Sequence, residues 1–259
     1  MRRLAVEVSA VAARRLRHLR RAPGRFLGIT LNPLLSMLVL GILFQKSATV
    51  PGGGSYQEYV FAGAVVQAGL AGVGPTAIAV ASDVRGGMAD RFRSMPIARS
   101  TVLLGHTAAD FLVGLGGLAL LTVFGVLLGW RPHGGVGETL GAFALAAAFG
   151  YAMLWVGVVL GLVSRSLETI SSITPLVATV LPFLSTAFVA PQNLPGWLRP
   201  VAEWNPVSVV AQTCRTLWHS GGGATDFPSG HPVPVLALTL GLTLLLSASF
   251  GLRRYRTAV

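Results

Sequence analysis

The chain has 259 residues, of which 53% are hydrophobic and 11% are charged, and its formal net charge at pH 7 is +11. Soluble domains carry roughly 25% charged residues, so this composition indicates an integral membrane protein. With one cysteine, Cys214, the chain can form neither an intramolecular disulfide nor a cysteine-rich metal site. The basic excess alone would permit nucleic-acid binding, but the long apolar runs and the placement of the basic residues argue against that class.

The first 25 residues contain eight arginines and predict an amphipathic helix over about 4–21. Its apolar residues occupy one arc of a helical projection, and the opposite arc carries Arg14, Arg17, Arg20 and Arg21. Such a helix lies in the headgroup plane of a membrane, which makes 1–25 an interfacial segment. A signal peptide is the competing interpretation. The charged region is too long for one, the next apolar run spans a full bilayer, and no A-x-A cleavage site follows.

Six apolar stretches are long enough to cross a membrane, because a bilayer core about 30 Å thick requires roughly 20 residues of helix. In chain order they are 26–45, 59–82, 102–130, 139–163, 169–190 and 232–252. Pro75, Pro175 and Pro182 lie inside these stretches and are expected to kink them. The predicted fold is therefore an all-α integral membrane protein that forms a single transmembrane domain over 1–259.

The basic residues set the predicted orientation, because cytoplasmic segments carry an excess of lysine and arginine. With both termini inside, the inner segments are the first 25 residues, the loop 83–100, the turn after the fourth stretch and the tail. They carry eight, four, one and three arginines, whereas the outer segments carry four of the 20 basic residues. This asymmetry predicts cytoplasmic termini and accounts for most of the basic charge without nucleic acid.

The loop 83–100, DVRGGMADRFRSMPIARS, is a charged segment between two apolar stretches. If it is helical, four residues share one apolar face: Val84, Met88, Phe92 and Met95. Asp83 would cap the start of this helix and Pro96 would end it. One interpretation is a helix that rests on the anionic inner leaflet. The other is a helix that docks into a groove of a soluble partner, with Met and Phe as anchors.

The segment 191–231, on the predicted outer side, is too polar to span a membrane and too apolar for an ordinary loop. Trp197, Trp204 and Trp218 carry amphipathic rings that favour the membrane interface. We expect two short helices here that enter the outer leaflet or cap a cavity, forming a re-entrant segment before the last span.

Motifs for catalysis are not found in the sequence, which contains no G-x-x-x-x-G-K-[ST] phosphate loop, no H-E-x-x-H and no G-x-S-x-G. We therefore predict no catalytic, cofactor-binding or metal-binding residue in this chain. His106 and Asp110 are four residues apart and could share a helix face. They are either a proton relay or substrate contact or, as we favour, a hydrogen-bonded pair near the start of a span. Gly157 and Gly161 form a G-x-x-x-G spacing, for which ordinary internal packing is the favoured interpretation.

The sequence GGMADRFRSMPIARSTVLLGHTAAD, which begins in this loop, closely resembles the cytoplasmic-loop signature of type-2 ABC exporter permeases, especially the daunorubicin/doxorubicin-resistance branch. The matching residues are Gly87, Asp90, Arg91, Phe92, Arg93, Ser94, Met95, Pro96, Gly105 and Asp110. A later segment, NLPGWLRPVAEWNPVSVVAQTCRTL, is similar to a second signature of these permeases ahead of the last span. His106 departs from the pattern, which has arginine at that position.

The resemblance implies the membrane subunit of an ATP-driven exporter in the cytoplasmic (inner) membrane. Two six-span subunits, identical or homologous, would pair, and two copies of a separate ABC ATPase would hold ATP and Mg. The cargo would be amphipathic drugs, secondary metabolites or lipid-like molecules, with unknown contact residues. The loop would contain a coupling helix, and the head helix would line the same interface. The implied ATPase-coupling residues are Met88, Asp90, Arg91, Phe92, Arg93, Met95 and Pro96.

Other functions stay open on the residues alone. An ion-coupled secondary transporter of small hydrophobic molecules needs ionisable groups near mid-membrane. The predicted span centres carry the uncharged Asn32 and Gln67, and Asp110 lies near the end of its span. A membrane-embedded enzyme needs a nucleophile and a base that face one another, and the sequence offers no convincing pair. A non-transporting anchor for an ATPase complex would have the same sequence features as a permease.

Overall fold

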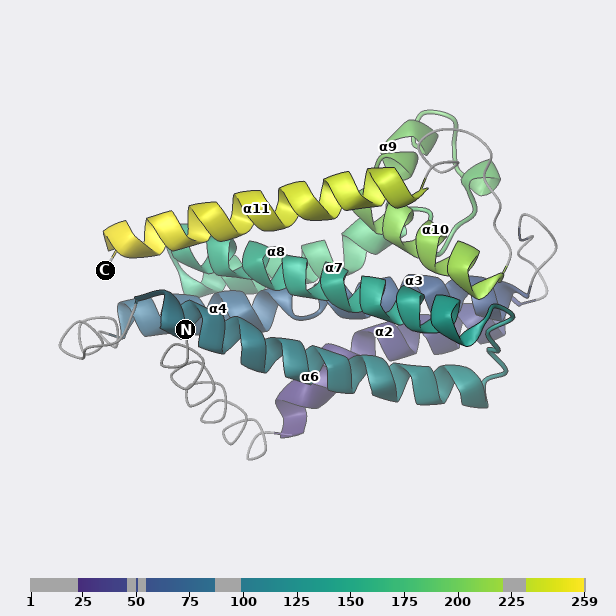
Figure 1. Ribbon diagram of the computed structural model, residues 1–259, viewed down its shortest axis with the longest axis horizontal. Coiled ribbons are helices and arrows are strands. Elements are labelled where there is room, and N and C mark those ends of the chain that lie inside the picture. The colour runs from purple at the N-terminus through teal and green to yellow at the C-terminus, as the bar shows by residue number, and fades with distance from the viewer. Residues whose placement is uncertain (1–22, 46–49, 51–54, 87–98, 221–231, 259) are drawn as a thin grey trace.

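The computed structural model of the chain describes residues 23–45, 50, 55–86, 99–220 and 232–258. Within these residues the regular secondary structure is helical, with no strand. The helices are α2 (Pro23–Leu43), α3 (Tyr56–Leu70), α4 (Val73–Arg85), α6 (Arg99–Leu127), α7 (Val136–Val163), α8 (Leu167–Phe183), η1 (Pro191–Asn193), α9 (Arg199–Glu203), α10 (Pro206–Trp218) and α11 (Pro232–Ala258). Figure 1 shows most of the long helices running roughly along the longest axis, with α9 and α10 near one end. The all-α prediction is confirmed for these residues.

Four helical stretches of the described chain are long and apolar enough to cross a membrane: Tyr56–Arg85, Leu103–Leu127, Val136–Val163 and Val235–Tyr255. They coincide with the second, third, fourth and sixth predicted spans. Two shorter apolar helices, Thr30–Leu43 and Leu167–Phe183, lie where the first and fifth spans are predicted. Large apolar side chains such as Leu35, Leu242 and Leu245 are exposed on the helix surfaces, as expected of faces that meet lipid. These are the features of a multi-pass membrane protein.

The second span is a broken helix. Helix α3 ends at Leu70 and α4 begins at Val73, with a turn at Ala71 and Gly72 between them. Pro75 lies in the first turn of α4, and its ring nitrogen cannot donate the helical hydrogen bond to the Ala71 carbonyl. The interruption therefore occurs next to a proline at which the sequence predicts a kink, while Ala71 and Gly72 keep right-handed helical backbone angles.

Helix α4 packs against α7 through glycines. A Cβ atom added at Gly157 would meet the Val73 carbonyl oxygen at 2.6 Å, and one added at Gly161 would meet the Ala77 carbonyl oxygen at 2.5 Å. Any side chain would push the two backbones apart, so both positions require glycine in this arrangement. The G-x-x-x-G spacing serves internal packing, as the sequence favours.

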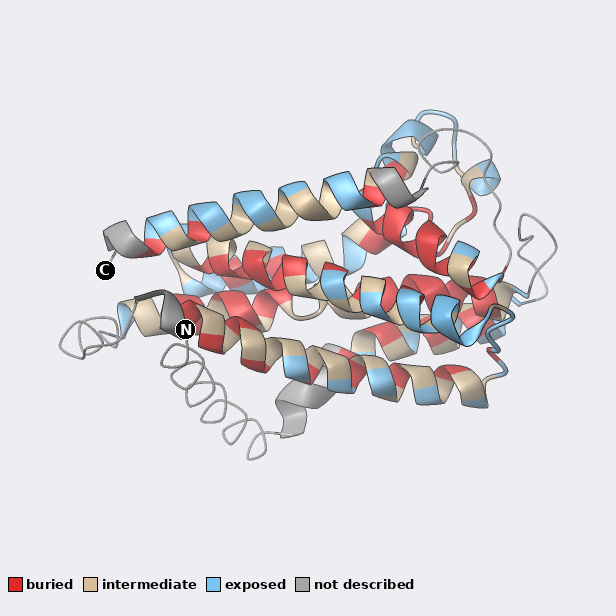
Figure 2. Ribbon diagram, in the orientation of Figure 1, coloured by how far each residue is buried: buried red, intermediate tan, exposed pale blue. Residues whose placement is uncertain are grey.

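Besides a small cluster of Ala77, Ala81 and Ile170 between α4 and α8, two larger apolar clusters hold the helices together. The larger one joins α3, α7 and α10 and includes Phe61, Trp130, Phe149 and Trp218. The smaller one joins α4, α6, α7 and α11 and consists of Val80, Leu103, Trp155, Val158 and Tyr255. Figure 2 shows buried residues concentrated on α3 and α10, with exposed residues on the outer faces of α6 and α11. Helix α7 contributes to both clusters and connects the two ends of the bundle.

The bundle has two ends with different polar contacts. At the end that we call the Arg85 end, α4 finishes, α6 begins and Ser164 follows α7. At the opposite end, the Trp218 end, the His133 N–H donates to the Trp218 carbonyl oxygen at 3.0 Å. The described residues that flank the loop 83–100, the turn after α7 and the tail lie at the Arg85 end, those of the outer segments lie at the Trp218 end, and α2 begins partway along the bundle (Figure 1). The arrangement is therefore compatible with the predicted topology.

The fifth apolar stretch ends earlier as a helix than its predicted limit at 190. Helix α8 ends at Phe183, with Pro182 in its last turn. Residues 184–188 form turns, and Ser185, Thr186 and Ala187 within them are buried. The apolar run continues beyond the end of the helix because these turn residues pack into the core.

Candidate functional site

The residues assigned to ATPase coupling lie outside the described residues. They fall within 87–98, and the four head arginines fall within 1–22: Met88, Asp90, Arg91, Phe92, Arg93, Met95, Pro96, Arg14, Arg17, Arg20 and Arg21. The structure does describe both anchors of the loop, since α4 ends at Arg85 and α6 begins at Arg99. Asp83 lies in the last turn of α4, so its predicted role as the N-cap of a separate helix is wrong. The helix of the second span simply continues past it.

Polar contacts hold the end of α4. The Asp83 carboxylate lies 2.7 Å from Nε2 of His106 on α6. The Arg85 guanidinium donates to the carbonyl oxygen of Ser164, just after α7, at 2.7 Å. Tyr255 of α11 is buried in the adjoining apolar cluster. The point at which the chain leaves the bundle for 87–98 is therefore joined to α6 and to the end of α7 and lies beside α11.

His106 and Asp110 both contact α4 from one face of α6. His106 pairs with Asp83, and Asp110 accepts a hydrogen bond from the Thr76 hydroxyl at 2.6 Å through Oδ2. These two contacts form a polar seam between α4 and α6 in an otherwise apolar bundle. The sequence favours a hydrogen-bonded pair of His106 and Asp110 near the start of a span; in the structure each of them has a partner on α4, Asp83 for His106 and Thr76 for Asp110.

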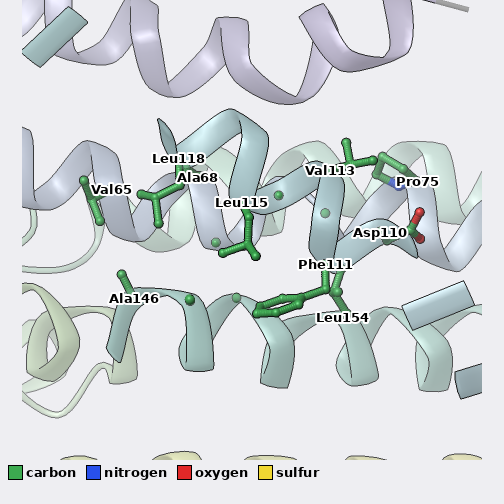
Figure 3. A pocket seen from close by; sticks show the side chains of 15 residues that line it. Val65, Ala68, Pro75, Asp110, Phe111, Val113, Leu115, Leu118, Ala146 and Leu154 are labelled. Carbon is green, nitrogen blue, oxygen red and sulfur yellow. The ribbon is translucent and has the colours of Figure 1, made fainter. Parts of the chain in front are cut away.

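A pocket of about 620 Å³, with the open space at its mouth included, lies between the broken helix α3–α4, α6 and α7. Figure 3 shows Asp110 at the same end of the pocket as Pro75 and Val113, with Val65 and Ala146 toward the other end. Asp110 is the one ionisable residue among the described residues that line it. The pocket is thus an apolar space with a single carboxylate at one end.

The described residues contain no group of three or more His, Cys, Asp or Glu side chains that could hold a metal ion. Two His–Glu contacts at the Trp218 end are separate pairs. Nε2 of His219 lies 3.2 Å from the Glu138 carboxylate, and Nδ1 of His133 lies 3.8 Å from the Glu58 carboxylate. The first connects the start of α7 with the end of α10, and the second connects the loop before α7 with the start of α3.

Arg215 is a fully buried cation that sequence reasoning missed. Its guanidinium donates hydrogen bonds to the carbonyl oxygens of Tyr59, Thr186 and Ala187, and its Cζ lies 3.5 Å from the centroid of the Tyr59 ring. Charge counting treats this arginine as part of an outer loop. In the structure it fastens α10 to α3 and to the turns after α8.

The outer segment forms two short helices, α9 and α10, as predicted, preceded by the single turn η1. Trp197 and Trp204 are exposed, 77% and 63%, which suits rings at a membrane interface. Trp218 is fully buried among Phe61, Trp130 and Phe143, so its predicted interfacial position is wrong. Its ring completes an aromatic cluster and thereby docks α10 in the core.

Comparison with known proteins decides the family. Residues 6–217 match the model of the ABC-2 type transporter family, which is most of the chain. The chain belongs to the ABC-2 type transporter family. It is similar to the daunorubicin resistance ABC transporter permease protein DrrB1 of Streptomyces coeruleorubidus, with 31% identity over 90% of this chain and 80% of the relative. It is also similar to the probable doxorubicin resistance ABC transporter permease protein DrrC of Mycobacterium tuberculosis, with 24% identity over 89% of this chain and 82% of the relative.

Membership of the ABC-2 type transporter family confirms the resemblance seen in the loop signature. It identifies this chain as a membrane subunit and not as the ATPase. The matched residues include the charged loop, the polar seam, the pocket and most of α10.

The burial of Arg215 and Trp218 has one signal in the sequence. The segment 206–218 has a strong helical amphipathic pattern, and in a membrane protein its apolar face needs cover from the other helices.

Proposed function

We propose that this chain is the membrane subunit of an ATP-driven exporter with six spans and both termini in the cytoplasm. The observation that carries the proposal is its similarity, over 90% of its length, to a relative named as a drug-resistance ABC transporter permease. The proposed cargo is amphipathic drugs, secondary metabolites or lipid-like molecules. The proposed location is the cytoplasmic membrane, with the Arg85 end on the cytoplasmic side.

The proposed ATPase contact is the loop between α4 and α6. Its apolar face, with Phe92 and Met95, would dock in a groove of the ATPase, and Arg91 and Arg93 would supply orienting charge. Two copies of the ATPase would bind ATP and Mg²⁺. The anchoring of Arg85 to Ser164 and of Asp83 to His106 supports this role, because those contacts would pass a displacement of the loop to α7 and α6.

A second permease subunit, identical or homologous, is the proposed partner within the membrane. Helix α8 exposes Ser171, Ser172 and Thr179 together with the apolar Ile173 and Leu176. A face in contact with lipid alone would be uniformly apolar, whereas polar groups at membrane depth favour protein or water as neighbours. Asn32 of α2 donates to Thr179 at 3.3 Å, so α2 lies beside this mixed face. We place the subunit contact and the transport path on these two helices.

An ion-coupled secondary transporter is the alternative. The carboxylate of Asp110, which lines a pocket inside a span, is the observation that favours it, because an ionisable group within a membrane can carry coupled charge. The family match weighs against it. A test must therefore distinguish transport driven by ATP from transport driven by an ion gradient.

Transport in defined vesicles tests the function. The chain and a partner ABC ATPase, reconstituted together, should accumulate doxorubicin only when ATP is present on the ATPase side. The chain alone should hydrolyse no ATP, because its sequence has no phosphate loop. ATP turnover by the chain alone, or uptake driven by an imposed proton or sodium gradient without the ATPase, would refute the proposal and favour the alternative.

Cysteine labelling tests the topology without replacing the native cysteine. Cys214 is fully buried, and burial raises the pKa of its thiol to about 12, so the reactive thiolate is scarce at neutral pH. We expect a membrane-impermeant maleimide to leave the native protein unlabelled. A cysteine in place of Gly222 should be labelled in intact cells, whereas cysteines in place of Gly86 or Ala258 should react only after the cells are opened. Labelling of the Gly86 variant in sealed cells would reverse the orientation.

A further inference from the structure

Residues 128–135, the α6–α7 connection, pack directly on the end of α10. The backbone N–H of His133 donates to the Trp218 carbonyl oxygen at 3.0 Å. Gly134 lies so close to α10 that an added Cβ atom would meet the Leu217 carbonyl oxygen at 2.5 Å. The two backbones therefore touch at this point, and the connection closes over the last turn of α10.

Two histidine–glutamate contacts join three helices at this junction. Nε2 of His219, at the end of α10, lies 3.2 Å from the Glu138 carboxylate in the first turn of α7. Nδ1 of His133 lies 3.8 Å from the Glu58 carboxylate in the first turn of α3. The two histidine side chains are 55% and 56% exposed, so protons from water can reach both rings. Titratable contacts thus link α3, α7 and α10 at one end of the bundle.

His219 has an unusual backbone conformation. Among the described residues it is the one non-glycine residue with a positive φ, 54°. It caps the end of α10, and its N–H bonds to the carbonyl oxygens of Arg215 and Thr216. Glycine or asparagine commonly occupies a left-handed cap of this kind, because a Cβ atom is strained there. A strained residue of this kind is a candidate for function, and here the side chain gained is an imidazole that contacts Glu138.

The Glu138 carboxylate is fixed independently of His219. Its Oε2 accepts the Gly135 N–H at 2.9 Å, as part of the capping box that starts α7. A neutral imidazole can donate one hydrogen bond to this carboxylate, whereas a protonated imidazole also supplies a full opposite charge. Histidine gains its charge between about pH 8 and pH 5, and a glutamate in water keeps its charge down to about pH 4. The attraction is therefore strongest under mildly acidic conditions.

The other described charges at this junction do not change over that pH range. On α10, the buried Arg215 donates to backbone carbonyl oxygens, and on the α6–α7 connection Arg131 is exposed. Arginine stays protonated in proteins. On α3, the Tyr56 hydroxyl donates to the Phe188 carbonyl oxygen. Of the described groups that face the junction, His133 and His219 are those whose charge responds to mild acid.

We propose that the two histidine–glutamate contacts form a proton-operated clasp, in which protonation of His133 and His219 fastens the α6–α7 connection to α3 and α10. The stabilisation is present at mildly acidic pH and is lost as the pH rises through the titration of the imidazoles. An exporter must open toward the outside to release its cargo, and the Trp218 end is the outer end in the proposed topology. Acid outside would therefore slow export. This transport effect rests on the proposed function, whereas the clasp itself does not.

Thermal unfolding of the full chain in detergent, at pH 5.5 and at pH 8, tests the clasp. The variant combines His133→Asn with His219→Asn, because asparagine tolerates the left-handed cap and forms hydrogen bonds but carries no charge. The midpoint of the wild type should exceed that of the variant by about 2–5 °C more at pH 5.5 than at pH 8. This excess should largely disappear in 1 M salt, which screens exposed ion pairs.

Two further variants keep the test decisive. Glu138→Gln keeps an acceptor for the Gly135 N–H and should reduce the pH-dependent excess as His219→Asn does, and the two changes together should reduce it no further. Glu203→Gln is the matched control. It removes an ion pair with Arg199 on α9, whose charge is the same at both pH values, so its effect on the midpoint should not depend on pH. A histidine double variant whose shift is also equal at both pH values would overturn the clasp.

ATP turnover tests the effect on transport. The chain and a partner ATPase are reconstituted with the ATPase facing outward, so the vesicle lumen corresponds to the outer side. Turnover is measured because an amine cargo would accumulate in an acidic lumen without transport. With the external pH fixed, wild-type turnover should fall about twofold to fivefold when the lumen is at pH 5.5 in place of 7.5, and the double variant should not respond. Wild-type turnover that ignores lumen pH would refute slowed export, and absence of ATP-dependent transport at either pH would count against the proposed function alone.

Discussion

Phe92→Ala combined with Arg91→Glu is expected to abolish efflux and to prevent co-purification of the ABC ATPase. Removing an aromatic anchor from the centre of a protein interface costs on the order of 2 kcal/mol or more, which is about thirtyfold in affinity. Reversing the neighbouring charge adds repulsion at the same surface. The measurements are the amount of ATPase retained on the tagged permease and the export of doxorubicin from cells that express both proteins.

Phe250→Ala is the matched control for this double variant. Phe250 lies on α11 with 49% of its surface exposed, so the same truncation removes an aromatic ring from a different exposed surface. This variant should insert, retain the ATPase and export normally. If the double variant also retains the ATPase and exports at the wild-type rate, the loop is a segment that rests on the inner leaflet, and the coupling assignment fails.

Arg215→Met is expected to lower the stability of the whole permease, since it removes a donor but leaves three buried carbonyl acceptors. The Thr186 oxygen keeps its bond from the Tyr59 hydroxyl, so the loss comes mainly from the Tyr59 and Ala187 carbonyls and is on the order of 3 kcal/mol. Burying methionine in place of arginine also removes the cost of desolvating a cation, and this effect raises the stability of the variant. The loss should dominate, because the carbonyl oxygens of Tyr59, Thr186 and Ala187 remain enclosed.

The measurement for Arg215→Met is the midpoint of thermal unfolding in detergent, followed by size-exclusion chromatography. At roughly 2–4 °C per kcal/mol for a chain of this size, the midpoint should fall by about 10 °C. Arg131→Met, at an exposed arginine of the α6–α7 connection, is the control and should stay within about 2 °C. Arg215→Lys should lie between them, because an ammonium group cannot reproduce the planar fork of donors. An unchanged midpoint in Arg215→Met would contradict the structural role of the cation.

Hydropathy and charge found most of the helices, because the length of a span and the lipid around it constrain composition strongly. They could not place α10. Its 13 residues are too few to span, and a linear count records Arg215 as an outer basic residue and Trp218 as an interfacial ring. Their burial depends on cover supplied by Tyr59 of α3 and by the turns near Thr186, which are distant in the sequence. The same limit applies to the early end of α8.

The candidate site was also predictable from the sequence only in part. The loop 83–100 was recognisable because its pattern of apolar and charged residues is local in the sequence. Asp110 stood out as an acidic residue near a span end, but its pocket depends on residues from several helices, such as Gly72 and Gly114, that come together only in the fold. A single sequence shows that glycines are present without showing which of them face empty space. Pro75 was the local signal for the break, and the sequence placed it correctly.

If the helix bends at Ala71 and Gly72, where its hydrogen bonding is interrupted, α4 would act as a lever that pivots at that point. Helix α4 has 13 residues and is therefore about 20 Å long. If its Arg85 end were displaced by about 5 Å, roughly one helical turn, the rod would tilt by about 15° around the break. The largest displacement would occur where the chain leaves for 87–98. Thr76 and the pocket residues Gly72 and Pro75 lie close to the fulcrum and would move least, so the bond from Thr76 to Asp110 of α6 would persist while the loop end of α4 moves.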